Sequence, residues 1–206
     1  MCREAVMFHE VVMSSEAIYN LPACGLGSAD SRSIQIGVEV DQNIEARQFY
    51  AETYDAWMSD WAGEMDFYRG LAAEEVKCKE GIVLDVACGT GRIGLRLAED
   101  GIFVIGLDRS PDMLAIARQK SANMDRIGWV EGDMRSFDLD KIFDLVVIPS
   151  HSFQNLNTAA DQAACIECIW RHLKPGGLLI VHLDHMNADT SWSQTTKTHF
   201  CTLKAE

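Results

Sequence analysis

Short apolar runs alternate with amphipathic helical patterns between about residue 81 and residue 183. The runs have the length of buried strands, and helical periodicity separates them. They are residues 81–87, 102–108, 127–130, 143–148 and 178–183. Buried strands that alternate with helices form a parallel sheet through right-handed crossovers. We therefore predict an α/β fold: a Rossmann-like, doubly wound, mostly parallel sheet with helices on both faces, short at its C-terminal edge.

Capping residues mark where the helices between these strands begin and end. Ser110-Pro111-Asp112 supplies an N-cap, a proline at the first helical position and an acid near the positive helix end. Thr158 opens a helix that runs to His172, and Asp100-Gly101 closes the helix that precedes the second strand. The boundaries of the central elements are thus encoded locally.

The chain divides into three parts. Residues 1–40 carry little pattern, and we expect a variable or partly disordered extension there. Residues 41–80 turn helical and aromatic, which predicts an N-terminal helical cap whose rings serve mainly in packing. Residues 81–206 contain the alternating elements and form the main domain.

Charge and composition narrow the class of protein. The net charge is −13, from 31 acidic and 18 basic residues, so the surface repels phosphate backbones and nucleic acid is disfavoured as a general partner. No apolar run approaches the roughly 20 residues that span a bilayer, and no secretion signal is seen. Cys165 and Cys168 match C-x-x-C inside an apolar helical pattern, which favours buried thiols, no metal site and a cytoplasmic location.

The most informative segment runs from the first strand into a glycine loop. Gly89-Thr-Gly91-Arg-Ile-Gly94 satisfies G-x-G-x-x-G, and Asp108 ends the next strand, where an acid can bind a ribose diol. These features fit a nicotinamide dinucleotide as well as another nucleoside cofactor. Asp85, just before the loop, is unfavourable for a pyrophosphate but suits a ligand with an ammonium and a sulfonium.

Residues 85–92, Asp85-Val-Ala-Cys-Gly89-Thr-Gly91-Arg, resemble the first motif of the class I S-adenosylmethionine-dependent methyltransferases. Further segments resemble the later motifs of this family, in order, and the similarity covers roughly residues 46–185. They are residues 106–118, 131–135, 143–153 and 173–177. The resemblance implies S-adenosylmethionine as cofactor, S-adenosylhomocysteine as product and a small-molecule methyl acceptor.

The resemblance also implies a role for each cofactor residue. Asp85 would order the loop and hold the amino end of the cofactor, with the backbone of Ala87, Gly89 and Gly91 close to its amino acid moiety. Asp108 would bind the ribose hydroxyls. Near the adenine would lie Met113, Asp133 and the backbone of Met134.

The acceptor side is less determined by the sequence. His151 follows the carboxyl end of the fourth strand, where sites of α/β proteins lie, and is our candidate catalytic residue together with Tyr54. Asp55 is a further candidate for closing the site. A base is needed only where the acceptor must lose a proton. Two alternatives remain open: a nicotinamide-dependent oxidoreductase and a non-catalytic nucleoside-binding protein.

The sequence departs from this family after the fifth strand. The family domain continues with a helix and two further strands, the last antiparallel, whereas roughly 20 residues follow His185. Residues 197–203 have the composition of one strand. We therefore expect an uncovered edge along residues 178–183, which would favour self-association.

Overall fold

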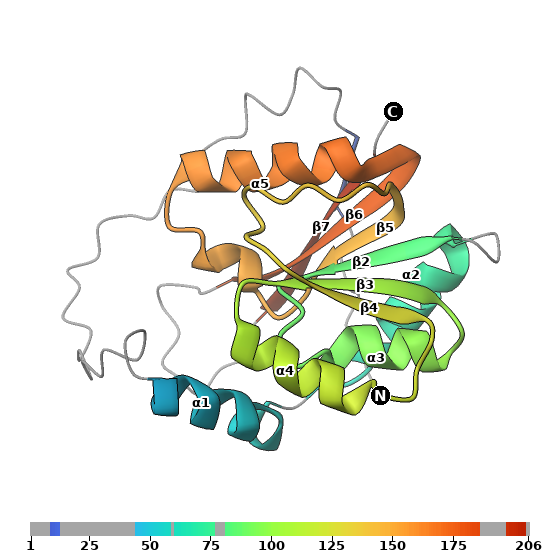
Figure 1. The fold of residues 1–206 in the computed structure, drawn as a ribbon. Helices are drawn as coiled ribbons and strands as arrows, with labels where there is room; N and C mark the ends of the chain where they lie inside the picture. The colour runs from blue at the N-terminus through green and yellow to red at the C-terminus, as the bar shows by residue number, and fades with distance from the viewer. Residues whose placement is uncertain (1–8, 13–43, 59, 77–80, 186–196, 205–206) are drawn as a thin grey trace, which may run out of the picture.

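The computed structural model describes residues 9–12, 44–58, 60–76, 81–185 and 197–204 (Figure 1). Its centre is a seven-stranded sheet in the order β1-β7-β6-β5-β2-β3-β4. The strands are β1 (His9–Val12), β2 (Ile82–Val86), β3 (Phe103–Asp108), β4 (Ile127–Glu131), β5 (Phe143–Ile148), β6 (Leu173–His185) and β7 (Lys197–Lys204). The helices are α1 (Ile44–Trp57), α2 (Glu64–Glu75), α3 (Arg92–Glu99), α4 (Pro111–Lys120) and α5 (Ala159–His172), with a short 3₁₀ helix, η2 (Ser152–Asn155).

Strands β2 to β6 pair parallel with one another, which confirms the predicted fold class. Alternate side chains of each strand face opposite layers, as the pleat requires. Leu84 and Val86 of β2 join the cluster that contains Ile169 of α5, whereas Val83 joins the cluster that contains Leu97 of α3. Figure 1 shows α5 on one side of the sheet and α2, α3 and α4 on the other.

The predicted caps are present. The Ser110 hydroxyl accepts from the Met113 amide, with Pro111 at the start of α4. The Thr158 hydroxyl accepts from the Asp161 amide at the start of α5. Gly101, with φ 87°, follows α3. The capping residues thus define where the crossover helices begin and end.

The expectation of an uncovered edge is wrong. Strand β7 pairs antiparallel with β6 from Leu178↔Lys204 to His185↔Lys197, and β1 pairs parallel with β7. One strand of eight residues is long enough to satisfy the backbone of the whole outer half of β6. The next strand comes from the first 40 residues, so the sheet is extended from both ends of the sequence. We expected self-association because of an uncovered edge along residues 178–183, and the structure covers this edge.

The helices α1 and α2 lie in the predicted N-terminal cap and pack against α4 and α3, respectively. Tyr68 of α2 is fully buried, as expected for a packing aromatic. Phe49, Tyr50 and Trp57 of α1 are instead exposed, because α1 contacts the domain along one face only. None of the helices in the described ranges is long and apolar enough to cross a membrane.

Candidate cofactor and acceptor site

The glycine loop lies at the carboxyl end of β2, between this strand and α3. Three of its residues have positive φ: Ala87 at 57°, Gly89 at 56° and Gly91 at 84°. An alanine in this region is unusual, because its Cβ approaches the following carbonyl oxygen. Such backbone strain clusters at functional sites. The strain at Ala87 therefore supports a functional role for the loop, and the sequence alone did not indicate it.

The two glycines of this loop have different surroundings. A Cβ built on Gly89 would meet nothing closer than Tyr54 Cε1, at 4.0 Å. A Cβ built on Gly91 would overlap the Trp129 ring and lie 3.2 Å from Leu95 Cδ1. Gly89 therefore borders open space that a ligand can fill, whereas Gly91 is needed for packing against β4.

Asp85 is fully buried beneath the loop. Its Oδ2 accepts from the Gly94 amide at 3.0 Å, while its Oδ1 has no hydrogen-bond partner among the described residues. Burial raises the pKa of Asp85 to about 7, against the effect of this hydrogen bond and of the Arg92 charge. A buried carboxylate oxygen without a donor is costly. It fits a ligand that brings an ammonium group to the loop.

Asp108 connects the loop to the start of α4. Its Oδ2 accepts from the Gly89 amide at 2.7 Å, and its Oδ1 accepts from the Ser110 amide at 2.8 Å. Asp108 thus orders the turn before α4, and it also stands at the end of β3 beside the loop, where the sequence places a ribose-binding acid. Met113, the third residue of α4, is buried.

Asp133 is held by a neighbour rather than free for a ligand. Arg135 donates to it through Nε at 2.9 Å and Nη2 at 2.6 Å, and its Nη1 also contacts Asp161. These hydrogen bonds lower the pKa of Asp133 to about 2. An adenine amino group would share this carboxylate with Arg135. Met134 packs against the core below α5.

Helix α1 reaches the loop through two adjacent residues. Tyr54 lies closest to the open side of Gly89, and burial, followed by the charge of Tyr50, raises the pKa of its phenol. Asp55 accepts from the buried Thr90 hydroxyl at 2.7 Å and also pairs with Lys120 of α4. Asp55 thus attaches α1 to the loop, while Tyr54 faces the space above it.

The turn after β5 brings the acceptor-side candidate to the same end of the sheet. Ser150 and His151 both have positive φ, at 53° and 50°, and His151 is the N-cap of η2. The His151 ring lies 6.1 Å from the ring of His182 on β6, and Trp61 lies 6.3 Å from His182. The sequence did not indicate this group of rings, because its members come from three separate segments.

We assigned no role to Arg92 from the sequence, although this side chain forms several hydrogen bonds beside the loop. Arg92 donates to Glu64 of α2 through both Nη atoms, at 2.6 and 2.9 Å, and to Ser150 Oγ at 2.8 Å. The only available signal was the position of Arg92 directly after Gly91. An acid in the first turn of a helix, as Glu64 is, ordinarily complements the helix dipole at the surface, so its burial could not be anticipated.

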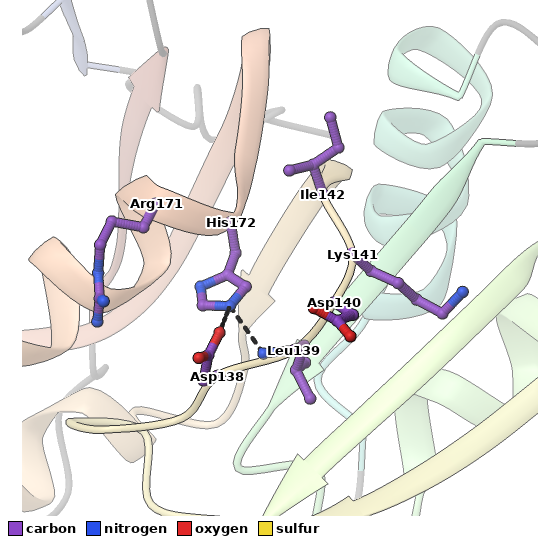
Figure 2. A pocket seen from close by; sticks show the side chains of 7 residues that line it. All are labelled: Asp138, Leu139, Asp140, Lys141, Ile142, Arg171 and His172. Carbon is purple, nitrogen blue, oxygen red and sulfur yellow. Dashed lines mark hydrogen bonds and ion pairs between the residues drawn. The ribbon is translucent and has the colours of Figure 1, made fainter.

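A cavity lies at the opposite, amino end of the parallel strands (Figure 2). It has a volume of about 470 Å³ and is lined by Asp138, Leu139, Asp140, Lys141, Ile142, Arg171 and His172. His172 is buried and fully engaged: Nε2 accepts from the Leu139 amide at 2.9 Å and Nδ1 donates to the Cys168 carbonyl at 2.7 Å. This histidine fixes a loop to α5 and has no nitrogen left for a ligand.

The described residues contain no cluster of histidine, cysteine or acidic side chains able to hold a metal ion. Cys165 and Cys168 are buried free thiols, as predicted, and Cys168 donates to the Phe137 carbonyl. Burial raises the pKa of Cys165 to about 12. The C-x-x-C pair is therefore part of the α5 core.

Comparison with known proteins identifies the class. Residues 83–177 match the family Methyltransf_25, a methyltransferase domain. The chain is 35% identical over 153 residues to the glycine/sarcosine N-methyltransferase of Parasynechococcus marenigrum (strain WH8102), which covers 69% of this chain and 52% of the relative. It is 33% identical over 149 residues to the dTDP-3-amino-3,6-dideoxy-alpha-D-glucopyranose N,N-dimethyltransferase of Streptomyces fradiae, covering 72% and 57%.

Solved structures of methyltransferases are also similar to this chain. DesVI of Streptomyces venezuelae superposes with a TM-score of 0.59 at 29% identity, over 69% of this chain and 60% of that one. CalS10, an amino pentose methyltransferase of Micromonospora echinaspora solved with S-adenosylmethionine bound, gives 0.56 at 31% identity, over 66% and 56%. By its sheet, its glycine loop and these matches, the chain belongs to the class I S-adenosylmethionine-dependent methyltransferases. It spans about half the length of the curated relatives it matches.

Proposed function

We propose that this chain transfers the methyl group of S-adenosylmethionine to the nitrogen of a small amine. The observation that carries the proposal is the buried carboxylate of Asp85, whose Oδ1 lacks a donor directly beneath the glycine loop. A nicotinamide dinucleotide would bring a pyrophosphate to this place, and the negative charges would repel each other. An ammonium-bearing cofactor supplies the missing donor.

In this proposal each predicted residue keeps its role. Asp85 holds the ammonium group of the cofactor, the backbone at Ala87, Gly89 and Gly91 lies beside its amino acid moiety, and Asp108 accepts from the ribose hydroxyls. The adenine lies near Met113, Asp133 and Met134. The bound cofactor supplies a methyl group on a sulfonium, which a nucleophile in line can displace, so positioning provides much of the rate.

With an amine acceptor, His151 would act as a general base. A small amine is protonated in neutral solution and becomes a nucleophile only after it loses a proton, which an imidazole nitrogen of His151 is suited to accept. Tyr54 closes the site from α1 and excludes water. The preference for nitrogen is supported by the relatives, two of which are named as N-methyltransferases of glycine and sarcosine and of an amino sugar. A cytoplasmic location remains part of the proposal.

Calorimetry with S-adenosylmethionine, S-adenosylhomocysteine and NAD tests the cofactor. Binding of the first two but not of NAD is expected, and tighter binding of NAD would overturn the assignment. A second measurement follows S-adenosylhomocysteine formation with glycine, sarcosine and dTDP-linked amino sugars as acceptors, with His151→Gln as the variant that should lose turnover and keep cofactor binding. Binding without methyl transfer to any amine would overturn the catalytic half.

A further inference from the structure

Two consecutive residues after β5 adopt a backbone conformation that L-amino acids avoid. Ser150 and His151 have φ 53° and 50°, and neither is a glycine or an asparagine. Such a turn persists only when contacts around it compensate for the strain. The backbone supplies the Ser152–Pro149 and Gln154–His151 hydrogen bonds, at 3.2 and 2.9 Å. The side chain of Ser150 supplies one more contact, to Arg92.

Arg92 is suited to hold this turn because its own position is fixed. The guanidinium forms a two-pronged pair with Glu64, at 2.6 and 2.9 Å, and Nη1 also donates to Asp60 at 2.6 Å. Glu64 is 1% exposed and the Arg92 side chain 11%. Burial acts against the charged guanidinium, but Glu64 and Asp60 outweigh this effect and raise the pKa of Arg92. The planar fork therefore presents Nη2 to Ser150 in one orientation.

The connection joins the two halves of the site. Arg92 is the first residue of α3 and follows Gly91 directly, so its backbone belongs to the cofactor loop. Ser150 lies 58 positions later, beside His151 on the acceptor side. This side chain therefore connects the loop to the turn directly, in addition to the pairing of β2 with β5.

We propose that Arg92 is a positioning residue that fixes the Ser150–His151 turn relative to the glycine loop. It acts through Ser150 on His151 and does not itself touch the reacting atoms. That the turn places an amine acceptor beside the methyl donor rests on the proposed function. The alternative is an ion pair that only joins α2 to α3, and such a pair would affect stability without affecting His151.

Ser150→Ala is the decisive variant, because it removes the hydroxyl and leaves the buried Arg92–Glu64 pair in place. Arg92→Lys keeps the positive charge and loses the fork. Arg96→Lys is the matched control, since Arg96 lies on the same helix and also pairs with Asp60, whereas the Ser150 hydroxyl is bonded by Arg92. The His151 ring is followed by NMR of histidine-labelled protein, with His151→Gln to assign its signal. Binding of S-adenosylhomocysteine is measured in parallel.

Ser150→Ala and Arg92→Lys should both shift or broaden the His151 ring signal, whereas Arg96→Lys should not. Affinity for S-adenosylhomocysteine should change less than threefold in Ser150→Ala. With an accepted amine, its turnover should fall about tenfold with an unchanged KM for the cofactor. The double variant Ser150→Ala/Arg92→Lys should change the His151 signal no more than either single variant does, because both substitutions break the same hydrogen bond.

An unchanged His151 signal in folded Ser150→Ala would overturn the positioning role, as would additive effects in the double variant. These NMR outcomes do not need turnover. If the wild-type chain fails to bind S-adenosylhomocysteine, the proposed function falls, while the His151 signal still decides whether Arg92 holds the turn.

Discussion

The two ends of the sheet differ in a way that cavity size does not reveal. The amino end holds the 470 Å³ cavity of Figure 2, but its buried histidine satisfies both ring nitrogens within the protein. The carboxyl end holds the unpaired Asp85 Oδ1 and every non-glycine residue with positive φ in the described ranges, namely Ala87, Ser150 and His151. Backbone strain and a missing hydrogen-bond donor, rather than cavity volume, thus distinguish the end where we propose that the cofactor binds.

The largest expected effect concerns the buried ion pair of the carboxyl end. Glu64→Ala leaves the Arg92 charge buried and partly unpaired, which should lower the free energy of unfolding by about 3–5 kcal/mol. Asp138→Ala is the control at the amino end, where the side chain is 95% exposed and its loss should be neutral. Urea denaturation of both variants measures the difference. A loss below about 1 kcal/mol, as for an exposed pair, would contradict the buried assignment.

The next effect separates the two glycines of the loop. Gly91→Val overlaps Trp129 and should cost about 2–4 kcal/mol of stability. Gly89→Val also places a β-branched residue at φ 56°, but its Cβ meets open space, so it should lose less stability than Gly91→Val and remain folded. It should nevertheless lose S-adenosylhomocysteine binding, because the side chain occupies the place that we propose for the ligand. Thermal denaturation and calorimetry measure the two properties. Normal binding by folded Gly89→Val would mean that the loop serves only to join strand and helix.

Asp108→Ala should weaken S-adenosylhomocysteine binding by about 1.5–3 kcal/mol, the range for a charge-assisted hydrogen bond. Part of this loss comes from the Gly89 amide, which Asp108 holds in place. Asp100→Ala, at the far end of α3, is the control and should bind as the wild type does. Equal affinities of the two variants in calorimetry would remove Asp108 from the site.

At the amino end, His172→Ala should act on stability alone. It leaves the Leu139 amide without a partner, which costs about 1–3 kcal/mol for a buried group. Cofactor affinity should not change, since the proposed cofactor site lies at the other end of the strands. If calorimetry instead showed weaker binding in the folded variant, the contrast between the two ends would fail.

The smallest effect is the pH dependence that Asp85 confers. Its pKa of about 7 means that the carboxyl group is half protonated near neutrality in the free protein. A cofactor ammonium favours the anion, so affinity should rise with pH up to about 7 and then level off, by at most about 1.4 kcal/mol per pH unit below 7. The stability of the free protein should change oppositely: Asp85 stabilises most below the unfolded pKa of 3.8, and this contribution is lost as pH rises to about 7.

Asp85→Asn should abolish this dependence in calorimetry between pH 6 and pH 7, and should give a weaker but constant affinity. Glu131→Gln, at the end of the outer strand β4, serves as the control for a general charge effect and should keep the slope of the wild type. A slope that survives in Asp85→Asn would assign the proton to another group.

The sequence by itself determined the central elements and the meeting of the glycine loop with Asp108. Phe143–Ile148 is a strand with the predicted bounds, and Ser110 and Thr158 cap their helices, because burial pattern and capping are local properties. The meeting of Gly89 and Asp108 also followed, since successive parallel strands that lie side by side bring their carboxyl ends together.

Only the tertiary structure decided what depends on contacts between distant segments. Gly91 is a packing glycine because Trp129 of β4 fills its space, and the edge of β6 is covered by strands from both ends of the sequence. The strained turn at Ser150 is held by Arg92, whose orientation in turn depends on the burial of Glu64. Each of these features is a long-range contact with no local period or cap, and so the pattern of residues along the chain carries no signal for it.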